Sequence, residues 1–151
     1  MDNGCIFCKI ASGEVPSYKV YEDNDYIAFL DVYPSLMGQT LVIPKKHTGS
    51  YAFDLDDDAL SRFVRISKRV AKLLEHGLDV DRVYLVLEGS GVDHLHAKLY
   101  PAIGRKGRGF VEMHGKEHVR FEKYEGYLNT TMGPKATDEE LRGVRDRIAE
   151  G

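Results

Sequence analysis

The sequence predicts an α+β domain in which one long helix packs on a mainly antiparallel sheet of about five strands. Three observations support this prediction. Short β-rich runs alternate with polar or glycine-rich turns. One stretch repeats apolar residues at helical spacing. The 151 residues, 42% hydrophobic and 30% charged, have the length and composition of one ordinary globular domain with a real core.

A short helix and three strands are expected before the long helix. Gly13 ends the short helix, because glycine readily adopts the left-handed conformation of a helix cap. The polar turn at 22–25 joins the first two strands into a hairpin. In chain order, these elements are a helix at 6–11 and strands at 18–21, 26–30 and 40–43.

The long helix is predicted to begin at Asp56 and to end at Gly77 as its C-terminal cap. Its acidic run, 54–58, is typical of a helix N-terminus, where negative charge is favoured. Apolar residues recur at the spacing of one buried helix face. These residues are Leu60, Phe63, Val64, Val70 and Leu74.

Two more strands, at 83–87 and 94–100, are joined by the glycine-rich connection 88–91. Thr137 and Glu140 then have the spacing of a capping box, which predicts a short C-terminal helix at about 138–149. Leu141, Val144 and Ile148 form its apolar face. We expect one domain over 1–151, with a core at about 5–103 and a C-terminal extension at 104–151.

Charge and hydropathy exclude several classes of protein. Lys and Arg number 21 against 24 Asp and Glu, so the net charge is −3 and no global positive field favours nucleic acid. No apolar run approaches the roughly 18 residues of a membrane helix. The first residues lack the pattern of a secretion signal, which predicts a cytoplasmic protein.

The run from Val92 to Pro101 carries the strongest chemical signal. Alternate residues of a strand share a face, so His94, His96 and Lys98 would project together at intervals of roughly 6.6 Å. Two imidazoles and an ammonium suit phosphoryl or nucleotidyl transfer. The preceding Gly89-Ser90-Gly91 turn could cradle an anion with its N–H groups. A solvated polar strand face is the alternative.

Cys5 and Cys8 form a C-x-x-C pair. In a reducing compartment such a pair favours a metal site or a redox centre over a structural disulfide. The residues alone leave metal ligands, free thiols and a redox pair open.

Several segments in the same order resemble the histidine triad (HIT) superfamily of nucleotide hydrolases and transferases, whose signature is His-φ-His-φ-His-φ-φ with φ apolar. The resemblance covers most of the chain and implies a HIT-like fold. It rests on the segments 5–10, 28–32, 38–47 and 94–100. Lys98 replaces the third histidine, the loop 88–92 is short, and Leu87 stands where many relatives carry asparagine.

The resemblance assigns the nucleophile to His96. It would form a covalent nucleotidyl-histidine intermediate and lose the nucleotide to water or another acceptor. Attack needs one ring nitrogen free and the other N–H held, in such folds by a backbone carbonyl. Lys98, the second predicted catalytic residue, offers a fixed positive charge but is a poor proton shuttle near pH 7. It therefore favours a leaving group that departs unprotonated, such as a polyphosphate.

The resemblance also implies one structural zinc ion per chain. Its ligands would be Cys5, Cys8, His47 and His94, a closed Cys₂His₂ set. Zinc would tie the N-terminal segment to the strand that carries the nucleophile. A metal-free thiol pair and a redox pair stay as alternatives.

For the nucleotide, the resemblance points to Asp31, whose carboxylate offers two acceptors to the two ribose hydroxyls. Capping a turn is its alternative role. Phe7, Ile10, Phe29 and Val32 would wall the base, although Ile10 and Val32 could equally be core residues. Ser90 and Gly91 would contact phosphate. His76, His114 and His118 receive no function.

The resemblance implies a hydrolase of nucleoside phosphates of the form NMP–X and a homodimer, as is usual for the family. The leaving group X would be a nucleotide, as in dinucleoside polyphosphates, or an amine, as in nucleoside phosphoramidates. A non-enzymatic nucleotide-binding or adaptor protein is one alternative. A nucleotidyltransferase or phosphorylase is the other.

Overall fold

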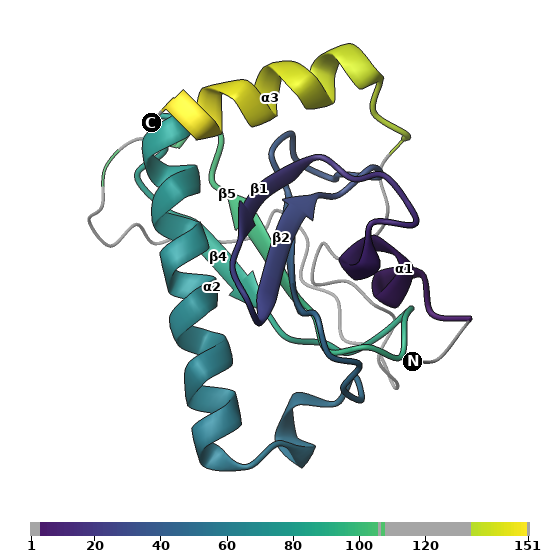
Figure 1. Ribbon diagram of the computed structural model, residues 1–151. Helices are drawn as coiled ribbons and strands as arrows, with labels where there is room; N and C mark the ends of the chain where they lie inside the picture. Colours follow the sequence, from purple (N-terminus) through teal and green to yellow (C-terminus); the bar gives the residue numbers. More distant parts are fainter. Residues whose placement is uncertain (1–3, 106, 108–133, 151) are drawn as a thin grey trace, which may run out of the picture.

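The computed structural model describes residues 4–105, 107 and 134–150 and contains a five-stranded sheet with three α-helices (Figure 1). The N-terminal helix is confirmed, and Gly13 ends it with φ 80°. The elements are α1 (Ile6–Ser12), β1 (Lys19–Glu22), β2 (Tyr26–Leu30), β3 (Thr40–Pro44), the 3₁₀ turn η1 (Ala52–Asp54), α2 (Asp57–Gly77), β4 (Val83–Val86), β5 (Ala97–Pro101) and α3 (Asp138–Glu150).

The strands lie in the order β1-β2-β3-β5-β4, and every neighbouring pair is antiparallel. The predicted α+β class with a five-stranded antiparallel sheet is therefore confirmed. In the β1–β2 turn, Asp23 accepts hydrogen bonds from the backbone N–H groups of Asp25 and Tyr26 at 2.9 and 2.7 Å. β4 forms one edge of the sheet, next to the strand that follows the histidines.

Alternate residues of the central strands build two apolar clusters on opposite faces of the sheet. Ala28, Leu30 and Val42 pack against α2 and α3 in the larger cluster. Ile27, Phe29, Leu41 and Ile43 pack against α1 in the smaller one. The α1 face carries both cysteines, and Figure 1 shows α1 apart from the two longer helices.

The long helix is confirmed, but its C-terminus differs from the prediction. Asp56 caps the N-terminus by accepting the Ala59 N–H at 2.7 Å. At the other end Gly77 is still helical, and Asp79 takes the left-handed conformation with φ 48°. The N–H groups of Asp79 and Val80 bond the carbonyls of His76 and Glu75, the pattern of a Schellman motif.

Gly77 is instead required where α2 meets α3. A Cβ at Gly77 would lie 2.2 Å from the Cα of Ile148, so only glycine fits beneath α3. Val64 also departs from the prediction, because its side chain is 39% exposed and lies outside the core. Ile66 faces the core in its place.

The predicted strand at 94–100 is wrong at its start, because β5 begins only at Ala97. His94 and His96 belong to an irregular segment before it. Leu95 follows the core alternation all the same and is buried in the larger cluster. The connection between β4 and β5 is accordingly longer than the four residues expected.

The C-terminal helix confirms the capping box. Thr137 Oγ1 accepts the Glu140 N–H at 3.2 Å, and the Thr137 N–H donates to the Glu140 carboxylate at 2.8 Å. The Ala136 N–H donates to the carbonyl of Val32, which ties the helix start to the segment after β2. The division into a core and an extension stays a prediction, and His114 and His118 lie outside the described residues.

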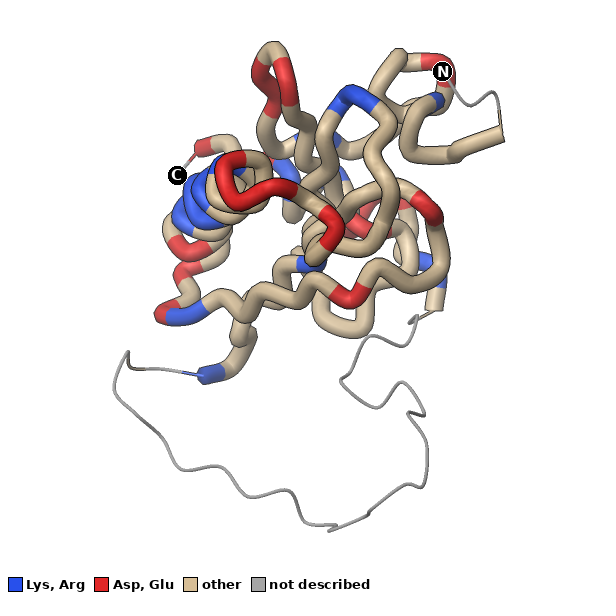
Figure 2. The backbone as a smooth tube through the Cα atoms, turned by 90° about the horizontal axis from the view of Figure 1, so that it is seen from below, with Lys and Arg blue, Asp and Glu red and all other residues tan. Residues whose placement is uncertain are grey.

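Positive and negative positions are both spread along the described backbone (Figure 2). Within the described ranges, no helix combines the length and apolar character needed to cross a membrane.

We expect Gly77→Ala to destabilise the protein by at least about 2 kcal/mol, because the methyl group must push α3 away from α2. Denaturant unfolding followed by circular dichroism measures the change. Gly143→Ala is the matched control: it is also a helical glycine, but its added Cβ meets nothing within 4 Å. That variant should gain about 0.5–1 kcal/mol. Equal stabilisation by both substitutions would contradict close packing at Gly77.

Candidate active site and metal centre

Four side chains with metal-binding atoms meet on the α1 face of the sheet. Cys5 caps the N-terminus of α1, and Cys8 follows within its first turn, so both sulfurs lie on one side of the helix. His47 lies just after β3, and His94 lies shortly before β5. Their ligand atoms all fall within 4.8 Å of one another.

The orientation of His94 suits metal binding. Its Nε2 is 2.9 Å from the carbonyl of Pro44, which can only accept, so the ring proton lies on Nε2. Its Nδ1 then faces the sulfurs of Cys5 and Cys8 at 3.4 and 3.5 Å. His47 Nδ1 lies 3.4 Å from the Cys8 sulfur. Two thiols and two imidazole nitrogens at such a site could hold a metal ion and fit the tetrahedral preference of zinc.

His96 lies directly beside this cluster. Its Nδ1 is 2.7 Å from the carbonyl of His94 and donates its proton there, so the Nε2 of the neutral ring is unprotonated. Its side chain is 3% exposed, and the ring centroid of Phe7 lies 5.4 Å away. Burial lowers the pKa of His96 below that of an ordinary histidine, and the charge of Lys98 acts in the same direction.

The alternative of a solvated polar strand face is wrong for the two histidines. His94 is completely buried, and burial lowers its pKa as well. The faces themselves alternate as expected, because Leu95, Ala97 and Leu99 lie in the larger cluster on the other side of the sheet.

Lys98 forms an ion pair with Glu88, a residue that the sequence interpretation treated only as part of a loop. The side chains of Lys98 and Glu88 are 14% and 11% exposed. The register of β4 against β5 explains why these two residues meet. Val86 lies opposite Lys98, so Glu88, two residues further, is a diagonal neighbour on the same face.

Asp31 lies just after β2, where two protein groups orient its carboxylate. The Tyr33 N–H donates to Oδ1 at 2.8 Å, and Gln39 Nε2 donates to Oδ2 at 2.7 Å. Asp31 therefore does cap a turn, as the alternative interpretation expected. Gln39 is 2% exposed and was not predicted from the sequence, because only the folded loop brings it to Asp31.

The residues expected to wall the base differ in exposure. Phe7, Ile10 and Phe29 are buried in the smaller cluster, with the rings of Phe7 and Phe29 6.0 Å apart. Ile10 thus occupies a core position. Val32 is 36% exposed, so its alternative role as an ordinary core residue is wrong.

Ser90 and Gly91 are exposed in the turn before the histidines. Gly89 and Gly91 have φ values of 67° and 91°, which glycine adopts without strain. A Cβ at Gly89 would lie 2.7 Å from the carbonyl oxygen of Ser50. The Ser50 N–H in turn donates to Asp93 at 3.0 Å, so segment 48–50 supports this turn.

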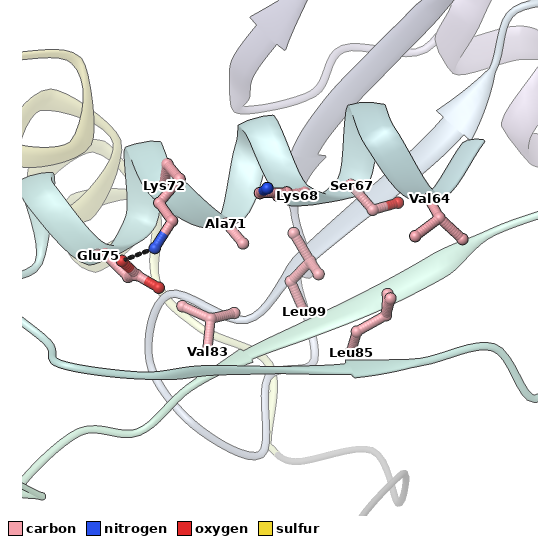
Figure 3. Close-up of a pocket in the computed structure, with 9 residues that line it drawn as sticks. All are labelled: Val64, Ser67, Lys68, Ala71, Lys72, Glu75, Val83, Leu85 and Leu99. Atoms are coloured by element: carbon pink, nitrogen blue, oxygen red, sulfur yellow. Dashed lines mark hydrogen bonds and ion pairs between the residues drawn. The ribbon is translucent and has the colours of Figure 1, made fainter. Parts of the chain in front are cut away.

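A separate cavity of about 300 Å³ lies between α2 and the β4 edge (Figure 3). Val64 and Leu85 flank it, and the Lys72–Glu75 ion pair closes one end. None of the predicted site residues lines this cavity. It is therefore distinct from the histidine site.

Comparisons with known proteins support the same family. A HIT domain profile matches residues 12–102. An uncharacterised HIT-like protein of Borreliella burgdorferi is 36% identical over 127 residues, 80% of this chain and 90% of that protein. Adenosine 5'-monophosphoramidase HNT1 of Saccharomyces cerevisiae is 41% identical over 107 residues, 67% of this chain and 64% of that protein.

Among solved structures, a hypothetical histidine triad nucleotide-binding protein from Sulfolobus tokodaii is similar, with a TM-score of 0.72 and 28% identity. The alignment covers 97% of this chain and 90% of that one. The five-stranded sheet and its helices thus match a HIT fold, and the profile matches more than half of the sequence. The chain therefore belongs to the HIT domain family.

Proposed function

We propose that this protein hydrolyses nucleoside phosphates of the form NMP–X through His96. The observation that carries the proposal is the fixed tautomer of His96, whose Nδ1–H is donated to the His94 carbonyl. A neutral imidazole whose Nε2 carries no proton is a competent nucleophile near neutral pH. The relative named adenosine 5'-monophosphoramidase supports the same class of substrate.

In the proposed reaction, His96 Nε2 attacks the phosphorus bound to the nucleoside, and the bond from phosphorus to X breaks. X leaves with the electron pair of that bond, as a phosphate anion or, where X is an amine, with a proton taken from solvent, and the nucleotide stays attached to the ring. Water then attacks the same phosphorus and gives up one proton to solvent, the bond to Nε2 breaks with its electron pair returning to the ring, and a nucleoside monophosphate leaves. The bond between Nδ1–H and the His94 carbonyl orients the ring in both steps.

The remaining residues hold the substrate. Asp31 accepts hydrogen bonds from the ribose, the side chains around Phe29 and Val32 wall the base, and the turn with Ser90 and Gly91 contacts phosphate. Lys98 would lie beside the phosphoryl oxygens together with its ion-pair partner Glu88. A phosphate or sugar-phosphate acceptor in place of water would make the protein a transferase or phosphorylase, and binding without turnover would make it a nucleotide-binding or adaptor protein.

We expect His96→Ala to reduce turnover of an adenosine phosphoramidate or a dinucleoside tetraphosphate by several orders of magnitude. Nucleotide affinity should stay within about tenfold, because the lost group acts mainly in the transition state. Released nucleotide is measured by chromatography, and Kd by calorimetry. His76→Ala removes an exposed histidine of α2 and should leave turnover unchanged. Comparable turnover in both variants would place the chemistry elsewhere.

We further propose that Cys5, Cys8, His47 and His94 hold one zinc ion per chain. When bound, zinc would supply a structural link in a closed four-ligand site. The residues support this role, because their side chains bring together α1, the segment after β3 and the segment before β5. The Pro44 carbonyl would hold His94 in the tautomer that binds metal through Nδ1.

The purified protein should therefore contain about one zinc per chain by elemental analysis. Cys5→Ala should lower the zinc content and clearly reduce Tm, because metal binding to the folded state contributes to its stability. Ser12→Ala changes an exposed residue of the same helix and should alter neither quantity. A metal-free protein with unchanged Tm would rule out the structural role.

We also propose a homodimer that pairs through the β4 edge. Among the strands that the structure describes, β4 has a neighbour on one side only, and an edge strand of this kind can pair with a strand of a second copy. Tyr84 and Leu85 on this strand are 41% and 42% exposed, and the apolar groove of Figure 3 continues the surface onto α2. The cytoplasmic location stays a prediction from the sequence.

We expect Leu85→Glu to convert the dimer to a monomer, because it buries a charge at the proposed interface. Light scattering coupled to size-exclusion chromatography would report a halved mass. Phe53→Glu is the control: Phe53 is 77% exposed and lies in η1, outside the β4 edge. A wild-type protein that is monomeric at micromolar concentration would refute the dimer.

A further inference from the structure

The ion pair between Glu88 and Lys98 changes the charge of the site that would receive phosphate. Lys98 lies two residues beyond His96, and the charges of Lys98 and Glu88 both act on the His96 ring. The two side chains are 14% and 11% exposed, so solvent screens them little. Lys98 therefore does not present a free positive charge beside the nucleophile.

Neither the Glu88–Lys98 pair nor the proposed metal centre beside it carries a net charge. A cation and an anion in direct contact have no net charge. The proposed centre of zinc, two thiolates and two neutral imidazoles also has no net charge. An incoming phosphate meets no net positive charge from these groups, and it approaches the carboxylate of Glu88.

We propose that Glu88 is a specificity-determining residue that limits how much negative charge the site accepts. This inference rests on the proposed function, since it concerns the phosphoryl group attacked by His96. A phosphoramidate of the form NMP–NHR carries one negative charge at phosphorus, whereas a dinucleoside polyphosphate carries one on each phosphate. Glu88 thus favours the phosphoramidate and promotes release of the doubly charged nucleoside monophosphate.

Lys98 alone would favour the opposite choice. A fixed, unpaired ammonium attracts the most highly charged substrate. This attraction would act in the same direction as the poor proton donation by Lys98, on which the polyphosphate expectation from the sequence rests. The Glu88 carboxylate cancels that attraction at short range. The two residues therefore act together on substrate specificity, and the effect depends on Glu88 as much as on Lys98.

The test measures how affinity depends on phosphate charge. Calorimetry gives Kd for a nucleoside and its mono-, di- and triphosphates, with wild type and Glu88→Gln. The substitution should tighten binding of the phosphorylated ligands by about tenfold and leave the nucleoside unchanged, because only a charge near phosphate is removed. Glu22→Gln makes the same change in net charge at the Lys19 and Lys45 ion pairs and should alter no Kd.

Substituting Lys98 alone and together with Glu88 tests whether the two residues act together on phosphate binding. Lys98→Met leaves a buried carboxylate beside the phosphate and should weaken monophosphate binding by about tenfold or more. Glu88→Gln combined with Lys98→Met removes both charges, keeps the volume of both side chains, and should restore much of the affinity. Because that protein has no buried unpaired charge, it keeps the test valid if Lys98→Met fails to fold.

Activity provides a second readout. The ratio of kcat/KM for a dinucleoside tetraphosphate over an adenosine phosphoramidate should rise at least about fivefold in Glu88→Gln. An unchanged ratio, an unchanged charge dependence of Kd, or weaker phosphate binding in Glu88→Gln would each overturn the role of Glu88. Failure of the wild type to bind any nucleoside or nucleotide is a different result and would refute the proposed function itself.

Discussion

His94 is the residue on which the rest of the site depends. Its Nδ1 faces the two thiols, its Nε2–H is held by Pro44, and its backbone carbonyl accepts the Nδ1–H of His96. One residue thus links the metal-binding cluster, the end of β3 and the proposed nucleophile. A displacement of α1 or of the end of β3 would therefore move His94 and, through its carbonyl, His96.

The sheet explains why this linkage is rigid. Its two faces are covered by different helices. Alternate residues of β2 and β3 point to opposite faces and belong to the two separate apolar clusters. Leu95 and Ala97 anchor the histidine segment to the larger cluster, while His94 and His96 point to the side of α1 and Phe7. The segment lies before β5, and two kinds of contact hold it in place: the Leu95 N–H donates to the carbonyl of Thr48 at 2.8 Å, and side chains pack on both faces.

Local signals predicted the parts of the structure that local interactions build. Asp56 and Thr137 cap their helices as their spacing predicts, and the hairpin turn is held by Asp23. Gly77 was misjudged because its reason is tertiary: α3 occupies the space of its missing side chain. The four residues that could hold a metal ion were singled out through the family resemblance, since spacing cannot show that residues 47 and 94 meet.

The Glu88–Lys98 pair was missed for a related reason. It depends on the register of β4 against β5, and the sequence predicts the two strands but not their alignment. The pair also explains how a lysine is accommodated near the buried His96. An unpaired ammonium there would carry a large desolvation cost, whereas an ion pair satisfies the cation and adds no net charge. Burial is the largest cause that lowers the pKa of His96; the charge of Lys98 acts in the same direction and that of Glu88 opposes it.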